Sequence, residues 1–119
     1  TWGGGLVDMV RCEIILDVME REGLVENAAE IGAYFLAGLE ALGSRSSGVS
    51  NVRGRGLMCA FDCVDEAARD RLVAESFQSG VLILSAGERS VRFRPPLTLT
   101  RDEVDFGLER LEHALSRSA

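Results

Sequence analysis

The chain has 119 residues, a length that suits one domain with one hydrophobic core. Apolar residues make up 46% and charged residues 27%, as in ordered globular proteins. The formal net charge of −6 argues against a nucleic-acid partner, which requires a net basic surface. No apolar run approaches the ~20 residues that a membrane-spanning helix requires, so a membrane partner is not expected.

The first half of the chain is predicted to be helical. Apolar residues recur three or four positions apart over 6–22, and a glycine at 23 is a natural helix stop. A second amphipathic helix is expected over 25–42, with an apolar stripe made by Ala28, Ile31, Phe35, Leu39 and Leu42. The first helix is expected to attach loosely, because its natural partner would lie upstream in a longer protein.

The second half is predicted to alternate strands and helices. Residues 49–62 have the pattern of strands interrupted by glycines, which indicate a bulge or a close backbone approach. A third helix is expected over 66–78, with Ala68, Leu72 and Phe77 pointing inward. A short buried strand over 81–84 should follow it.

The last part of the chain has the clearest boundary signals. A strand over 90–94 ends at two prolines, which cannot donate to a sheet ladder. Thr100 and Glu103 form a capping-box pattern that starts the last helix, in which Gly107 costs roughly 1 kcal/mol relative to alanine. The element order predicts an α+β fold, a small antiparallel sheet of 3–4 strands with helices packed on it.

The cysteines and the single histidine do not form a metal-site pattern. Three cysteines, Cys12, Cys59 and Cys63, cannot pair completely, and nothing marks secretion, so we expect reduced thiols in the cytoplasm. A structural zinc site needs four ligands at tight spacing, so no metal is expected. His113 is predicted to be a surface residue near the end of the last helix.

The basic residues carry the chemical signal. All thirteen are arginines, so no lysine is available to form a Schiff base with a carbonyl cofactor. Arg92 and Arg94 lie two apart in an extended segment and should point to one face of a sheet. A guanidinium group binds a carboxylate through two parallel hydrogen bonds, so this segment is suited to hold an acid. The alternative is a structural arginine paired with an acidic neighbour.

Three segments resemble, in the same order, class III pyridoxal-phosphate aminotransferases. Thr-Trp-Gly-Gly at 1–4 resembles the segment after the cofactor lysine, although Gly5 stands where the family usually has asparagine. Arg-Gly-Arg-Gly-Leu-Met-Cys-Ala-Phe at 53–61 resembles the first strands of the small C-terminal domain. Arg-Phe-Arg-Pro-Pro-Leu-Thr at 92–98 resembles the carboxylate-binding strand. Their fuller forms are similar to the lysine 6-aminotransferase branch.

The resemblance implies the C-terminal small domain of a fold-type I pyridoxal-phosphate transferase. Residues 1–23 would be a helix that links the large and small domains, and residues 24–119 the small domain of a longer enzyme, consistent with a start other than methionine. Thr1 is implied to bind the phosphate of pyridoxal 5'-phosphate held by the neighbouring subunit of a homodimer. Arg92 is implied to bind the substrate carboxylate. No catalytic residue is expected in this chain, since the Schiff-base lysine lies outside it.

The implied reaction transfers the ε-amino group of L-lysine to 2-oxoglutarate, giving glutamate and a semialdehyde. The isolated chain is expected to be inactive. Two alternatives remain: another ω-aminotransferase acting on ornithine, 4-aminobutyrate or acetylornithine, or a non-catalytic module that binds a small acid or a protein. Arg53 and Arg55 are expected to be solvated or ion-paired, and the role of Arg94 stays open.

Overall fold

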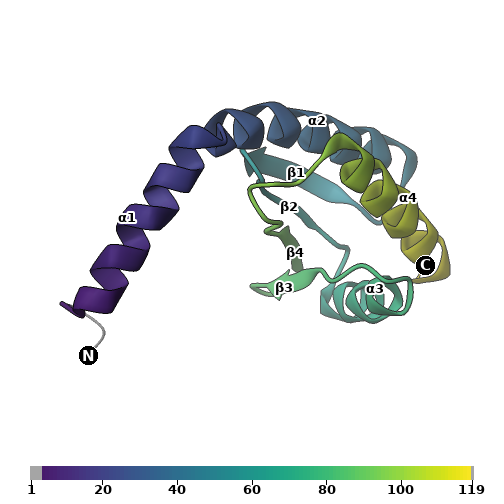
Figure 1. The fold of residues 1–119 in the computed structure, drawn as a ribbon. Helices are drawn as coiled ribbons and strands as arrows, with labels where there is room; N and C mark the ends of the chain where they lie inside the picture. Colours follow the sequence, from purple (N-terminus) through teal and green to yellow (C-terminus); the bar gives the residue numbers. More distant parts are fainter. Residues whose placement is uncertain (1–3, 119) are drawn as a thin grey trace.

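The computed structural model describes residues 4–118, which form four helices and one four-stranded antiparallel sheet (Figure 1). The helices are α1 (Leu6–Arg21), α2 (Leu24–Arg45), α3 (Glu66–Gln78) and α4 (Arg101–Ser118). The strands are β1 (Ser50–Arg55), β2 (Met58–Asp62), β3 (Leu84–Ala86) and β4 (Ser90–Phe93), in the order β1-β2-β4-β3. The predicted α+β class and the antiparallel sheet are confirmed.

The core lies between one face of the sheet and three helices. Alternate residues of β2 and β4 point into it: Cys59, Phe61, Val91 and Phe93 are at most 9% exposed. The predicted stripe of α2 covers them, and the ring of Phe35 meets that of Phe93 edge-on at 5.2 Å between centroids. The intervening strand residues point away from the helices, to a side called here the open face, which carries Arg53, Arg55, Asp62, Ser90 and Arg92.

Helix α1 projects away from the rest of the domain (Figure 1). It buries no side chain, although its sequence is rich in apolar residues. The exposed apolar side chains are those of Leu6, Val7, Met9, Val10, Ile14, Ile15 and Leu16, each at least half exposed. So large an apolar surface is typical of a helix whose partner is another part of a longer chain or another molecule.

Two details of the predicted elements are wrong. Phe77 is 65% exposed rather than buried, because α3 turns Arg69, Leu72 and Ser76 inward and the residue after Ser76 lies about 100° further round the helix. The strand predicted over 81–84 is instead β3, which begins at its last residue. The amide of Val81 donates to the carbonyl of Ser76, so it closes the end of α3 rather than joining the sheet.

The glycine signals in the first strand pair are confirmed. The register of β1 against β2 shifts between Ser50 and Arg53, where Asn51 has a positive φ of 51°. Gly54 lies so close to Cys59 that an added Cβ would be 2.7 Å from its sulfur. These features place Arg53 opposite Ala60, on the same face as Asp62.

Side chains from α2 and α4 hold the segment between β4 and α4. The side-chain amide of Asn27 in α2 donates to the carbonyls of Leu97 and Leu99, at 2.7 and 3.1 Å. The predicted capping box is confirmed: the amide of Thr100 donates to the Glu103 carboxylate at 2.8 Å, and the Glu103 amide donates to the Thr100 hydroxyl at 3.3 Å. Among residues 4–118, no helix is long and apolar enough to cross a membrane.

Candidate carboxylate-binding site

Arg92 occupies the centre of the sheet, opposite Ala60 of β2 and Leu84 of β3. Its Nε is buried and has no hydrogen-bond partner. Within residues 4–118, no carboxylate oxygen lies within 4.0 Å of its guanidinium group, whereas Arg53 and Arg69 both have such partners. The described residues therefore do not support the alternative of an internal ion pair. A buried donor left unpaired costs about 1–3 kcal/mol, which makes Arg92 the candidate ligand-binding residue of this site.

A cavity of about 230 Å³ adjoins Arg92, and Leu84 of the edge strand β3 also lines it. Arg92 and Arg94 both line it, so the structure brings together the two arginines that the sequence placed on one face. The rest of the lining is mostly apolar and includes Phe35, Leu82, Leu84, Phe93, Leu99 and Val104. An apolar wall excludes water and strengthens the attraction between a guanidinium group and an anion.

The one carboxylate in the cavity wall belongs to Glu103. It accepts hydrogen bonds from the backbone and the hydroxyl of Thr100, and these bonds lower the pKa of Glu103. Its charge is thus engaged at the start of α4. The two arginines of the wall remain available to an acid from outside.

A buried arginine, Arg69, holds the β3–β4 hairpin that carries Arg92. The Nη1 of Arg69 donates to the carbonyls of Gly87 and Glu88, at 2.8 and 2.7 Å, in the turn between β3 and β4. The same guanidinium contacts Glu66 and Asp70, so its charge is paired. Sequence reasoning missed Arg69, because an arginine inside a helix gives no sign of which turn it contacts.

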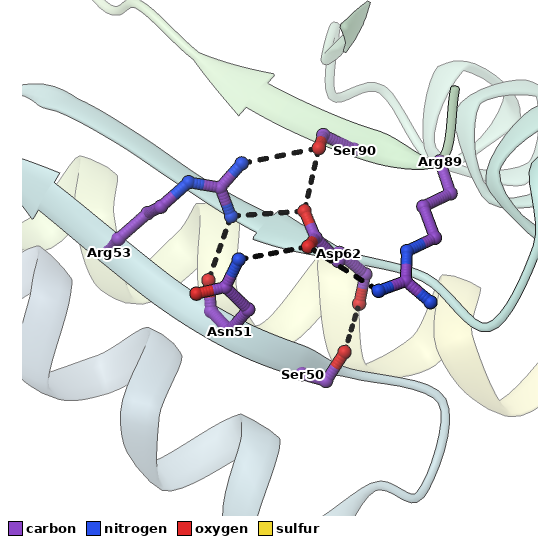
Figure 2. Close-up of polar contacts among 6 residues, drawn as sticks. All are labelled: Ser50, Asn51, Arg53, Asp62, Arg89 and Ser90. Atoms are coloured by element: carbon purple, nitrogen blue, oxygen red, sulfur yellow. Dashed lines mark hydrogen bonds and ion pairs between the residues drawn. The ribbon is translucent and has the colours of Figure 1, made fainter. Parts of the chain in front are cut away.

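A second cluster that the sequence did not reveal lies on the open face beside Arg92 (Figure 2). Asp62 is only 8% exposed and accepts from Asn51 Nδ2 at 2.9 Å, Arg53 Nη1 at 3.0 Å and Ser90 Oγ at 2.6 Å. Arg89 Nη2 lies 3.9 Å from the same carboxylate. The hydrogen bonds from Asn51, Ser90 and Arg53 lower the pKa of Asp62 to about 2.

The chain that carries this geometry is similar to known proteins along almost its whole length. The profile of the family "Aminotransferase class-III" matches residues 1–115. The chain belongs to the class III aminotransferases. The resemblance drawn from the three segments is therefore confirmed.

Several aminotransferases are similar along almost the whole chain. The L-lysine-epsilon aminotransferase of Amycolatopsis lactamdurans is 47% identical over 118 residues, which are 98% of this chain and 26% of that protein. The ornithine aminotransferase of Bordetella pertussis is 36% identical over 120 residues, 28% of its length. A solved lysine aminotransferase from M. tuberculosis superposes with a TM-score of 0.94 at 45% identity, covering 100% of this chain and 28% of that one. This aminotransferase domain thus spans about a quarter of the length of its relatives.

The remaining predicted residues fall into three groups. Thr1 lies outside the described residues. Arg53 is ion-paired with Asp62, as expected, while Arg55 and His113 are exposed. Cys59 and Cys63 are buried in the core, and their burial raises the pKa of both thiols, so they are not thiolates at neutral pH.

Acid should weaken this aminotransferase domain through Asp62. Because the folded pKa lies below the ordinary aspartate value, the stabilisation is complete above that value and is lost as pH falls from about 4 to about 2. The guanidinium groups of Arg53 and Arg89 would then face a neutral side chain in place of the carboxylate. We expect the stability difference between the wild type and Asp62→Asn, measured by urea unfolding, to shrink across this range. A difference independent of pH would contradict the prediction.

Proposed function

We propose that this chain is the C-terminal small domain of an enzyme that transfers the ε-amino group of L-lysine to 2-oxoglutarate. In this proposal residues 1–23 link the domain to a larger one, residues 24–119 form the small domain, and the whole enzyme is a cytoplasmic homodimer. The higher identity to a lysine aminotransferase (47%) than to an ornithine aminotransferase (36%) supports lysine as the amino donor.

The single observation that carries the proposal is the state of Arg92. Its buried Nε lacks a partner, and an apolar cavity adjoins it. A planar guanidinium group in such a site binds a carboxylate through two charge-assisted hydrogen bonds. Arg92 would hold a carboxylate of 2-oxoglutarate and so orient its oxo group. L-lysine reacts through an amine at the opposite end from its own carboxylate, so it would depend less on Arg92.

The cofactor of the proposed enzyme is pyridoxal 5'-phosphate. An amine transaminase from an uncultivated Pseudomonas species, 38% identical with a TM-score of 0.82, is described in its pyridoxal-phosphate-bound form. When bound, the cofactor supplies the electron sink for amine transfer. The residue of this chain that would hold it is Thr1, through the phosphate. The lysine that binds the cofactor would belong to the rest of the enzyme, since this chain has none. Arg92, with its orphaned donor beside a cavity, fits the substrate rather than the cofactor.

A substrate profile of the full-length enzyme tests the proposal. We expect glutamate to form from 2-oxoglutarate fastest with L-lysine, and by at least about tenfold in kcat/KM over ornithine, 4-aminobutyrate and acetylornithine. Residues 1–119 alone should form no glutamate, because the Schiff-base lysine is absent. A preference for ornithine would change the assigned amino donor. Turnover by the isolated chain would contradict the proposal that residues 1–119 carry only part of the active site. An acid-binding module without catalysis would show no turnover in the full-length protein either.

A further inference from the structure

The Asp62 cluster ties three strands together on the face that carries Arg92. Its hydrogen-bond donors come from β1 (Asn51 and Arg53) and from β4 (Ser90), and Arg89 in the turn before β4 forms a longer ion pair with it, while Asp62 ends the strand between them (Figure 2). The carboxylate therefore bridges β1 and β4 across β2. Three donors and one further guanidinium group around one carboxylate leave it little freedom to move.

A short stretch of β4 connects the Asp62 carboxylate bridge to Arg92. Ser90 and Arg92 are two apart in β4, opposite Asp62 and Ala60 respectively, so their side chains lie on the same face. About 7 Å of extended backbone separates them. The hydrogen bond of 2.6 Å from Ser90 to Asp62 fixes the strand immediately before Arg92. Because no described residue pairs with the Arg92 guanidinium, the position of that group depends on the strand itself.

The cluster also determines which arginines of the open face have an acidic partner. Arg53 donates to Asp62, Asn51 and Ser90, so its guanidinium is committed inside the cluster. Arg89 lies 3.9 Å from the same carboxylate, which offsets part of its charge. An incoming dianion such as 2-oxoglutarate thus meets Arg92 and its cavity neighbour Arg94, rather than Arg53 or Arg89. Without the Asp62 carboxylate, Arg53 and Arg89 would compete with Arg92 for the dianion.

We propose that Asp62 is a positioning residue for the oxo-acid substrate, holding the β4 strand that presents Arg92 and engaging the arginines that would compete with it. This inference rests on the proposed function, because it takes Arg92 as the carboxylate ligand. A merely structural Asp62 would affect both substrates alike. A positioning role affects the substrate that Arg92 holds.

Asp62→Asn in the full-length enzyme is the first test. The amide keeps the shape of the side chain but loses the charge that orders its three donors and Arg89. We expect kcat/KM for 2-oxoglutarate to fall about tenfold, mainly through KM, while kcat/KM for L-lysine changes less than about twofold. Ser90→Ala cuts the link to β4 and leaves the Asp62 charge in place, so it should give the same split at about threefold. This second variant keeps the proposal testable if Asp62→Asn does not fold.

The matched control is Glu112→Gln, the same acid-to-amide change at an exposed pair on the helical layer, where Glu112 lies 3.1 Å from Arg45. It should leave both substrates unchanged. Equal losses for lysine and 2-oxoglutarate, or no loss in either Asp62→Asn or Ser90→Ala, would overturn the positioning role. Wild-type turnover separates the two hypotheses: activity with another amino donor moves only the donor assignment, while absence of any 2-oxoglutarate-dependent activity removes the proposed function and this inference with it.

Discussion

Replacing Arg92 with alanine in the full-length enzyme is expected to lower kcat/KM for 2-oxoglutarate about 100-fold, an effect of ~3 kcal/mol. The two charge-assisted hydrogen bonds that Arg92 would make to the carboxylate disappear, and apart from Arg94 and the engaged Glu103 the rest of the cavity wall is apolar. The loss for L-lysine should stay within about threefold, because lysine reacts through the end that Arg92 does not hold. Steady-state kinetics with each substrate varied in turn measures both values.

Two further variants make this result specific. Arg92→Lys keeps the charge but not the planar pair of donors, so we expect an intermediate loss of about tenfold for 2-oxoglutarate. Arg55→Ala removes an exposed arginine from the same sheet face and should change neither substrate. Equal losses for both substrates in Arg92→Ala would make Arg92 structural. A loss in Arg55→Ala as large as in Arg92→Ala would point to the general charge of the face instead.

Local periodicity predicted most of the fold. The stripe of α2 was read correctly because helical spacing alone decides which residues share a face, and Ile31, Phe35, Leu39 and Leu42 are all buried. Phe77 was misplaced because an error of one residue in the helical pattern turns a side chain from the core to the solvent. The apolar character of Phe77 does not show which way its side chain faces. The β3 boundary was misplaced because the closure of α3 uses the amide of Val81, a contact that the apolar run cannot reveal.

The site was only half predictable, for a physical reason. The shared face of Arg92 and Arg94 was predicted because extended backbone puts residues two apart on one side, a local rule. The residues that contact the β3–β4 turn and the start of β4 were missed, since their partners are distant in sequence. Asp62 meets Ser90 across 28 positions, and Arg69 meets Gly87 across 18. Such pairings depend on strand order and on the bulge in β1, and neither can be read from the residue types.

The largest expected effect on stability is at Gly32, where α2 meets the turn between β1 and β2. A Cβ added at Gly32 would lie 2.3 Å from the carbonyl carbon and oxygen of Gly56. These are backbone atoms of a turn in which Gly56 holds a positive φ of 54°, so they cannot move aside as a flexible side chain would. Helix propensity favours alanine by about 1 kcal/mol, but a clash of this kind costs about 3 kcal/mol, so packing decides the sign.

We therefore expect Gly32→Ala to destabilise the domain by about 2 kcal/mol, the clash less the gain in propensity. Gly107→Ala is the matched control, since Gly107 lies within α4 and an added Cβ there meets nothing within 4 Å. It should stabilise the domain by up to about 1 kcal/mol through propensity alone. Amide hydrogen exchange in the full-length protein, followed in α2, β1 and β2, measures the local change. Exchange in Gly32→Ala that is as slow as in the wild type, or slower, would contradict the prediction.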